Sequence, residues 1–160
     1  MQFFGADERT VSGNSPSLLY PGTFTWEKSD GTTEEITVPG SYDVPAGETM
    51  VITSTLSADF DASSIAIRSS LQDVNIYING TLREQYSTSK TRLIGKNSAS
   101  RFIFCSTSHE DAGKELRIEL TTYTSNYSGV VNQIFCGDKA DIWQLIFNHY
   151  GLATYIAFFT

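Results

Sequence analysis

Apolar and polar residues alternate with a period of two through most of the chain, between residues 23 and 135. The run 74–79 alternates Val, Ile and Ile with Asn, Tyr and Asn, and the run 116–121 alternates Leu, Ile and Leu with Arg, Glu and Thr. Successive side chains of a strand point to opposite faces, so each run predicts a strand with one buried and one wet face. Further strands are predicted at 24–28, 35–38, 49–56, 65–68, 82–86, 102–105 and 129–135.

Two dipeptides predict tight hairpin turns between these strands. Asp30-Gly31 separates the first two runs, and Asn79-Gly80 separates 74–78 from 82–86. Such pairs are typical of two-residue turns in which both positions need a positive φ. About eight or nine short strands with frequent turns indicate an all-β fold, a jelly-roll β-sandwich, with a barrel as the alternative. We find no internal repeat.

The period changes after Gly137, where the sequence predicts a helix. Asp138 can cap it, and Asp141 in the first turn suits the helix dipole. The expected apolar positions are Ile142, Leu145 and Ile146 on one face, with Trp143, Phe147 and Tyr150 on the adjoining one. So broad a stripe must pack on something.

Three segments are therefore expected: a lead-in at 1–20, a sandwich at 21–137, and a helix with a following segment at 138–160. Residues 152–160 are apolar but shorter than the roughly 20 residues that a helix needs to cross a bilayer. They are a final core strand, a docked tail, or the first part of a membrane span; the sequence leaves this open.

Charge narrows the function classes. The 160 residues carry 11 Lys and Arg against 18 Asp and Glu, a net charge of −7. A nucleic-acid partner is excluded on this basis, because such proteins need a basic face. Abundant Ser, Thr and aromatic residues with modest charge indicate an extracytoplasmic β-protein.

The sequence indicates no active site, metal site or cofactor. The two histidines, His109 and His149, have no metal-ligand spacing, and there is no Cys-x-x-Cys, Gly-x-Ser-x-Gly or phosphate-binding loop. Asp59 and Asp61 sit in a turn where solvation explains them better than bound calcium does. We therefore expect a chain without enzymatic activity.

Ligand binding remains, and cations near one long loop (87–100) are the leading candidates. The residues expected to bind are Arg68, Gln72, Tyr77, Tyr86, Arg92, Lys96, Asn97 and Ser98. Arginine, lysine and amide groups can hold a carboxylate or a polyhydroxyl ligand, and tyrosine can stack on a sugar ring. In the alternative interpretation, the arginines pair with Glu84, Glu115 or Glu119 and the tyrosines pack along the sheet.

Two interpretations are open for the two cysteines, Cys105 and Cys136. They are small buried thiols, which we favour, or they form a disulfide in an oxidising compartment.

Three blocks carry a resemblance to a known family. They are Ile67–Tyr86 with its Asn-Gly turn, Arg92–Ser100, and Asp111–Leu120. The first resembles the hairpin of galactose-binding-domain-like jelly rolls. In this order and followed by a helix, the three resemble the extracytoplasmic sensor domain of membrane signalling proteins from anaerobic Gram-positive bacteria, over about residues 20–150. The two cysteines depart from that pattern, which has aliphatic residues there.

The resemblance implies an extracytoplasmic sensory domain anchored in the membrane through segments outside this chain. Its output, outside these residues, would commonly be a GGDEF diguanylate cyclase and less often a histidine kinase. The expected partner is a small molecule, a carbohydrate or a carboxylate, or an extracytoplasmic protein, with a homodimer in the full-length protein. The alternatives are a non-catalytic carbohydrate-binding module of a secreted enzyme and a structural adhesin domain.

Overall fold

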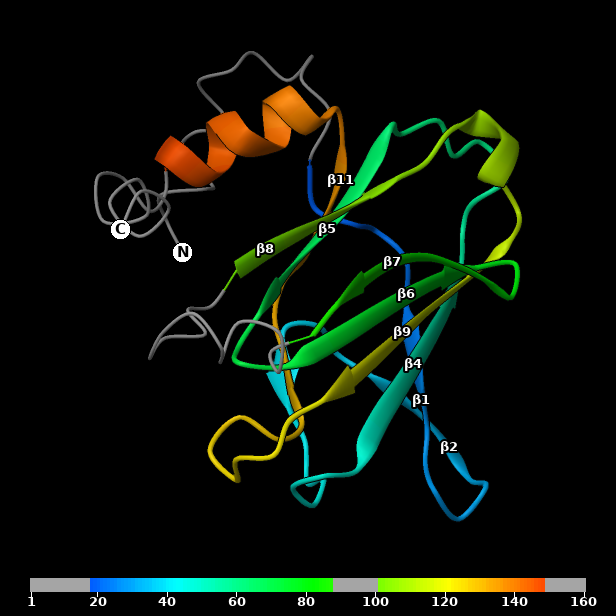
Figure 1. The fold of residues 1–160 in the computed structure, drawn as a ribbon. Helices are drawn as coiled ribbons and strands as arrows, with labels where there is room; N and C mark the ends of the chain where they lie inside the picture. The colour runs from blue at the N-terminus through cyan, green and yellow to red at the C-terminus, as the bar shows by residue number, and fades with distance from the viewer. Residues whose placement is uncertain (1–17, 88–100, 149–160) are drawn as a thin grey trace.

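A computed structural model of the protein describes residues 18–87 and 101–148, and these form a jelly-roll β-sandwich with a helix docked on one sheet (Figure 1). The all-β sandwich predicted from the alternation is confirmed. Nine of the eleven strands in the described ranges have four or more residues, and the other two form a short ribbon.

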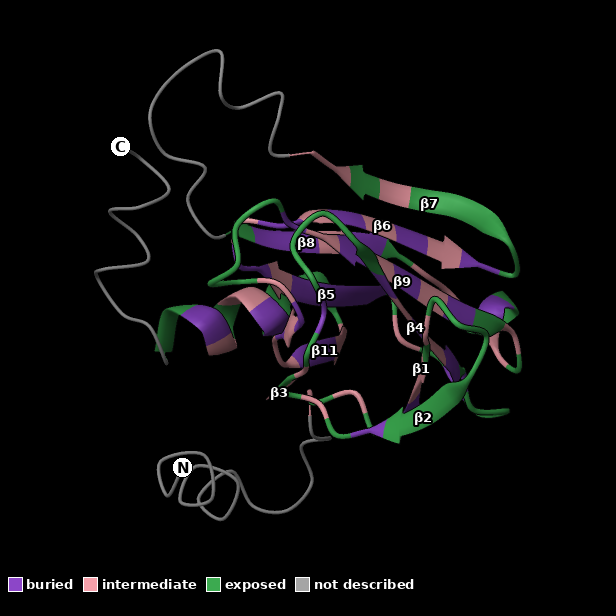
Figure 2. Cartoon of the chain, turned by 90° about the horizontal axis from the view of Figure 1, so that it is seen from below, coloured by how far each residue is buried: buried purple, intermediate pink, exposed green. Residues whose placement is uncertain are grey.

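The larger sheet has six antiparallel strands in the order β2-β1-β4-β9-β6-β7. Its strands are β1 (Phe24–Glu27), β2 (Thr33–Ile36), β4 (Thr49–Thr55), β6 (Asp73–Ile78), β7 (Thr81–Tyr86) and β9 (Glu115–Thr121). Strands β2 and β7 form its edges and are the most exposed, whereas the strands between them are buried on their inner side (Figure 2).

The smaller sheet has three antiparallel strands in the order β11-β5-β8, and a separate ribbon pairs β3 with β10. The bounds are β3 (Gly40–Ser41), β5 (Ser64–Ser69), β8 (Arg101–Ser106), β10 (Val130–Val131) and β11 (Ile134–Gly137). The chain crosses between the two main sheets repeatedly, so β9 lies between β4 and β6, and β5 between β11 and β8. This crossing pattern is typical of jelly rolls.

The two hairpin turns form as predicted in position but differ in geometry. Asn79 (φ 53°) and Gly80 (φ 79°) are both left-handed, as a two-residue turn requires. In the first hairpin only Gly31 is left-handed (φ 89°), because the Gly31 N–H binds the Lys28 carbonyl and the loop has a longer form. The prediction of two positive φ values is therefore wrong for Asp30.

Residues 129–135, predicted as one strand, are divided between two sheets. Strand β10 pairs with β3, and β11 pairs with β5. Between them, the Asn132 side-chain amide donates to the Arg68 carbonyl (2.8 Å) and to Ser70 Oγ (2.7 Å). These bonds hold the chain where it passes from one sheet to the other.

The start of the described chain already belongs to the sandwich. The Cys136 N–H binds the Leu18 carbonyl (2.8 Å), and the Tyr20 N–H binds the Ile134 carbonyl (2.9 Å). Residues 18–20, expected in the lead-in, thus lie along β11.

The main core fills the space between the inner faces of the two sheets. Ile52, Ile76 and Ile118 from the larger sheet are fully buried. Ile65 and Ile67 of β5 face them and are equally buried. These are the apolar positions of the alternating runs, so the pattern predicted the inner faces correctly.

The opposite face of the smaller sheet is buried as well, against the helix. This second cluster contains Ala66, Phe102, Phe135, Ile142 and Ile146. Every residue of β5 except Arg68 is therefore buried, because apolar groups cover both faces of the strand.

The predicted helix is confirmed over residues 139–148. Asp138 caps it, since its carboxylate accepts a hydrogen bond from the Ala140 N–H (3.0 Å) and its carbonyl accepts one from the Ile142 N–H (3.0 Å). Tyr150 and the run 152–160 lie outside the described residues. Among those described, no helix has the length and apolar character needed to span a bilayer.

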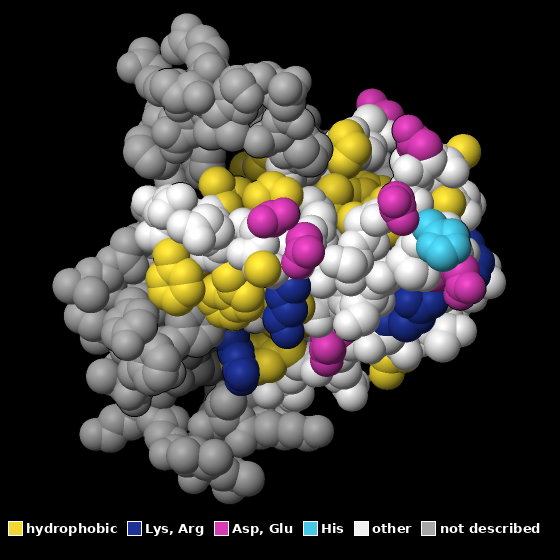
Figure 3. Space-filling model, turned by 90° about the horizontal axis from the view of Figure 1, so that it is seen from above, with side chains coloured by type: hydrophobic (Ala, Val, Ile, Leu, Met, Phe, Trp, Pro, Cys, Tyr) yellow, Lys and Arg dark blue, Asp and Glu magenta, His cyan; other side chains and the backbone are white. Residues whose placement is uncertain are grey.

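An aromatic row follows the helix at the margin of this second cluster. Trp143 lies 5.1 Å from Phe104 and 5.8 Å from Phe147, between ring centroids. The Lys139 ammonium sits 5.2 Å from the centre of the Phe104 ring. Seen from this side, the surface shows hydrophobic side chains next to basic ones (Figure 3).

An ion pair joins edge strand β7 to the turn between β8 and β9. The Asp111 carboxylate, 2% exposed, accepts hydrogen bonds from two guanidinium nitrogens of Arg83 (2.8 and 3.2 Å) and from the Ser108 N–H (3.0 Å). The Arg83 hydrogen bond is the main reason that the pKa of Asp111 lies below its usual range. The pair ties the edge of the larger sheet to the loop that closes the sandwich.

Replacing Ile142 by alanine should destabilise the protein by about 2–4 kcal/mol, because it opens a cavity in the second cluster. Urea denaturation checks this. The exposed Gln144→Ala on the same helix is the control, with an expected change within about 0.5 kcal/mol. Equal effects of the two substitutions would mean that the helix is not docked as described.

Asp111→Asn should lower the free energy of unfolding at neutral pH by about 1–2 kcal/mol, since it removes the charged acceptor of Arg83. The folded-state pKa is lowered, so the wild-type contribution is present above the ordinary value of 3.8 and is lost as the pH falls through the folded-state pKa. Urea titrations at several pH values should show the difference shrinking in acid. The exposed Glu110→Gln serves as control, and a gap that does not change with pH would contradict the assignment.

Candidate ligand-binding groove

The inner face of β1 and β2 changes from apolar to polar towards the hairpin turn. Phe24 and its partner Ile36 are buried. The next inner pair is Trp26, which is half-buried, and Glu34, which is exposed. Lys28 follows in the same row, because alternate residues of a strand share a face.

A groove of about 710 Å³ opens over this polar end. The hairpin contributes Trp26, Lys28, Ser29, Asp30 and Glu34, and the facing segment contributes residues 41–45, Glu48 and Thr49. We call it the Trp26 groove. Its volume falls within the range of about 300–1,000 Å³ that is usual for small-molecule sites.

Tyr42 forms the wall opposite the hairpin. Its hydroxyl accepts a hydrogen bond from the Thr37 N–H (2.8 Å) and donates one to the Thr37 carbonyl (2.5 Å), which closes the loop between them. The Tyr42 ring centroid lies 5.8 Å from that of Trp26, with an angle of 52° between the planes. The two rings are thus held at an angle to each other.

Lys28 lies over the indole ring of Trp26, and its positive charge is balanced by the carboxylate of Glu34. Its ammonium is 4.9 Å from the centre of the Trp26 ring and 2.8 Å from Glu34 Oε1. Its hydrogen bond to Glu34 raises the pKa of Lys28 above the ordinary value. Cation–π contact and ion pair together give this half-buried lysine a defined position.

The remaining carboxylates of the groove differ in their hydrogen bonding. Asp30 Oδ1 accepts hydrogen bonds from the Thr32 N–H (2.9 Å) and hydroxyl (2.6 Å), and these bonds lower its pKa. Asp43 and Glu48 are exposed, and their carboxylates have no hydrogen-bond or ion-pair partner within 18–87 and 101–148. Their oxygens are therefore open to a ligand.

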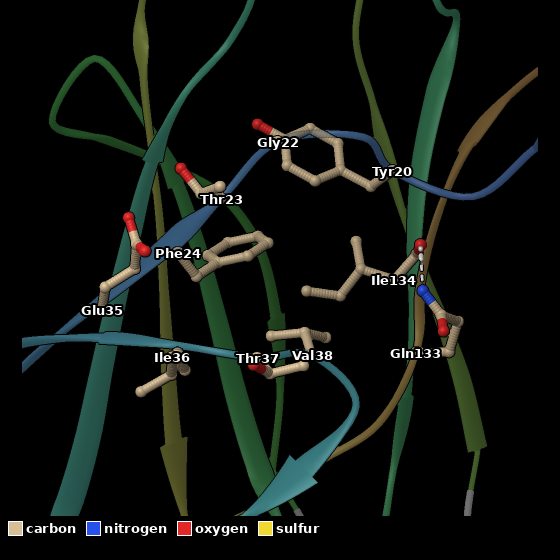
Figure 4. A pocket seen from close by; sticks show the side chains of 10 residues that line it. All are labelled: Tyr20, Gly22, Thr23, Phe24, Glu35, Ile36, Thr37, Val38, Gln133 and Ile134. Atoms are coloured by element: carbon tan, nitrogen blue, oxygen red, sulfur yellow. Dashed lines mark hydrogen bonds between the residues drawn. The ribbon is translucent and has the colours of Figure 1, made fainter.

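A second, smaller pocket of about 280 Å³ lies at the other end of β1. Figure 4 shows Phe24, Val38 and Ile134 converging on it, with the Tyr20 ring above them. The Tyr20 hydroxyl is paired with Ser54 Oγ (2.8 Å), and burial raises the pKa of Tyr20. This pocket is the open margin of the main core, narrower than the Trp26 groove.

Two of the predicted binding residues belong to the smaller sheet and its exit loop. Arg68 is half-buried on the face of β5 that carries Ala66, towards the helix. Gln72 is 1% exposed, and its side-chain amide donates to the carbonyls of Tyr127 (3.1 Å) and Val130 (2.7 Å). These two buried hydrogen bonds give Gln72 a structural role in holding the segment at 127–130.

The two predicted tyrosines lie on opposite faces of the larger sheet. Tyr77 is on the outer face, 5.9 Å from the guanidinium of Arg117, which pairs with Glu119 (2.8 Å). Tyr86 pairs with Val74 on the inner face, packs against the core and carries Arg101 over its ring at 5.6 Å. The structure thus does not bring Arg68, Gln72, Tyr77 and Tyr86 into one site; Arg92, Lys96, Asn97 and Ser98 lie outside the described residues.

Cys105 and Cys136 are free thiols. Both are register partners of Ile65, one from each side, so a whole strand separates them. Two strand spacings amount to about 10 Å, beyond the reach of a disulfide. The disulfide alternative is therefore wrong. Burial raises the pKa of Cys105 to about 11 and that of Cys136 above the ordinary value.

The Trp26 groove was not predicted, because the predicted binding residues lie around the cationic side chains near the loop at 87–100. The available signal was Trp26 itself, two residues after a core phenylalanine and next to a hairpin turn. Within 18–87 and 101–148, no group of three or more His, Cys, Asp or Glu side chains could hold a metal ion.

No family model, curated protein or solved structure matches this chain. Its function is accordingly inferred from the fold, the groove and the connection between them.

Gln72→Leu should destabilise the protein by about 1–3 kcal/mol, because two carbonyls lose their buried donor. Chemical denaturation measures this. Gln85→Leu, at an exposed position of β7, should change stability by about 0.5 kcal/mol or less. Unchanged stability of Gln72→Leu would return this residue to the candidate ligand contacts.

Proposed function

We propose that this chain is a non-catalytic, ligand-binding sensory domain on the extracytoplasmic side of a membrane-anchored signalling protein. The ligand binds in the Trp26 groove, and the helix at 139–148 passes the response on. The output domain, a diguanylate cyclase or a histidine kinase, lies outside these residues. What supports the proposal is the continuity of one segment from the groove wall to the helix.

That segment starts beside Tyr42. The Tyr42 N–H binds the Gly129 carbonyl (2.8 Å), and β10 then pairs with β3, whose residue Ser41 lines the groove. Gly129 is left-handed (φ 80°), and a Cβ there would lie 1.8 Å from the Tyr42 carbonyl oxygen, so only glycine allows this approach. Two residues after β10 the chain enters β11, and Asp138 then caps the helix.

Rigid contacts make the segment suitable for transmission. Gln72 and Asn132 bind it to the turn between β5 and β6, and β11 carries Phe135 into the cluster under the helix. A displacement of the 41–45 wall therefore reaches the helix through paired strands and packed side chains. A ligand can drive it only by preferring one of the two positions, typically by 1–3 kcal/mol.

The test uses a bulky adduct in place of a ligand. Ser41→Cys, labelled with fluorescein maleimide, places the adduct in the groove wall. A Cys136→Ala background leaves only the buried Cys105, whose high pKa keeps it unreactive. Hydrogen exchange in 139–148 should change by about fivefold or more on labelling.

Glu27→Cys, labelled in the same background, is the matched control, because it lies on the outer face of β1. It should leave exchange in the helix unchanged. Equal responses of the two labelled proteins, or no response of either, would refute transmission from the groove to the helix.

A further inference from the structure

The Trp26 groove is lined by more carboxylates than ammonium groups, and we infer that it binds a linear aliphatic polyamine. The carboxylates belong to Asp30, Glu34, Asp43 and Glu48, and the one ammonium group belongs to Lys28. This inference rests on the proposed function and specifies its ligand class. The inferred ligand is a cation, whereas the cationic side chains near 87–100 predicted a carboxylate or a polyhydroxyl ligand.

The groove already holds one ammonium group, which belongs to the chain itself. The Lys28 ammonium lies 4.9 Å from the centre of the Trp26 ring and 2.8 Å from Glu34 Oε1. An aromatic face and a carboxylate are the two kinds of partner that stabilise a bound ammonium group. This position is filled, so a ligand binds beside it, along the facing segment of the groove.

The facing segment carries two carboxylates that are open to a ligand. Asp43 and Glu48 are exposed, and among the residues that the structure describes no side chain or backbone group pairs with their carboxylates. Ionised carboxylates accept hydrogen bonds and donate none, whereas ammonium groups donate and accept none. Ammonium groups of a ligand would therefore satisfy both side chains with charge-assisted hydrogen bonds.

The spacing of the acidic groups favours a ligand with several separate charges over a single metal ion. Within the described part of the chain, no three His, Cys, Asp or Glu side chains are grouped closely enough to hold a metal ion. The four carboxylates nevertheless line one groove. A polyamine spreads its ammonium groups along a flexible chain, so different groups can reach different carboxylates and match their charge.

The hydrogen-bonding character of the groove favours a polyamine over a basic peptide. The Lys28 ammonium, which could donate, is paired with Glu34, and the hydroxyls of Ser41 and Thr49 can accept as well as donate. A peptide brings backbone carbonyl groups that need donors, and a carbonyl without one is unfavourable. A polyamine brings only donors and methylene groups, and the methylene groups can pack beside the half-buried Tyr42. The groove volume of about 710 Å³ also lies in the small-molecule range.

Isothermal titration calorimetry of the whole chain with spermine and with tetralysine, a peptide of similar net charge, tests the inference. Spermine should bind with a Kd below about 1 mM, and tetralysine should bind more weakly. Asp43→Asn/Glu48→Gln should weaken spermine binding by about tenfold or more, because it removes two charged acceptors. Both side chains are exposed, so the variant should fold normally.

Asp61→Asn/Glu110→Gln is the matched control, because it removes the same amount of negative charge from exposed positions away from the groove. Asp61 follows β4 and Glu110 precedes β9, at the end where Thr55 pairs with Glu115; Thr49, at the opposite end of β4, borders the groove. At about 0.15 M salt the affinity of this variant for spermine should stay within about twofold of wild type. Circular dichroism and the urea midpoint check that both variants are folded.

Three results would overturn the inference. They are no binding of spermine up to about 10 mM, binding of tetralysine at least as tight as that of spermine, and a folded Asp43→Asn/Glu48→Gln protein that loses no more affinity than the control. The adduct experiment uses no polyamine, so the two proposals fail separately. A helix response without spermine binding rejects the ligand class alone, and spermine binding without a helix response rejects the sensory role alone.

Discussion

A mismatch in width between the two sheets is the constraint on which the rest of the structure depends. A six-stranded sheet faces a three-stranded one, so the inner side of β1 and β2 extends past the strands that could cover it. Where β11 and the lead-in residues still reach, Phe24 and Ile36 are buried; further along, Trp26, Glu34 and Lys28 face the groove. A sheet face without a covering layer must become polar or bind something, because exposed apolar area is costly. In this chain the uncovered face becomes polar at Glu34 and Lys28, beside the half-buried Trp26.

The smaller sheet is narrow but buried on both sides, and this gives the molecule its connection between groove and helix. Strand β5 contacts the main core through Ile65 and the helix cluster through Ala66. Strand β11 beside it continues directly from the ribbon that pairs with the groove wall. Close-packed interiors transmit displacements because their side chains have few alternative positions. The groove wall and the helix are therefore joined through paired strands, without a separate hinge.

The local structure could be predicted well because it depends on neighbouring residues. Alternation identified the long strands, Asn79-Gly80 a two-residue turn, and Asp138 the helix start. The errors arose from competition between distant segments and from local irregularities of the two hairpins. Residues 129–135 form two strands because Asn132 finds acceptors on β5 and Ser70, and the Asp30 turn differs because its loop closes through Lys28. The predicted site residues were the least accurate part of the prediction. The bulge in the pairing of β6 with β7 places Tyr77 and Tyr86 on opposite faces of the sheet.

The sequence by itself determined the fold class, the inner faces of the strands and the helix with its buried stripe, because period and capping are properties of adjacent residues. Only the tertiary structure decided which residues share a surface. The approach of Tyr42 to Trp26, the separation of Cys105 from Cys136 by one strand, and the burial of Gln72 all follow from strand order. Strand order is set by long-range pairing, which depends on the packing of the whole core and which no short window of residues encodes.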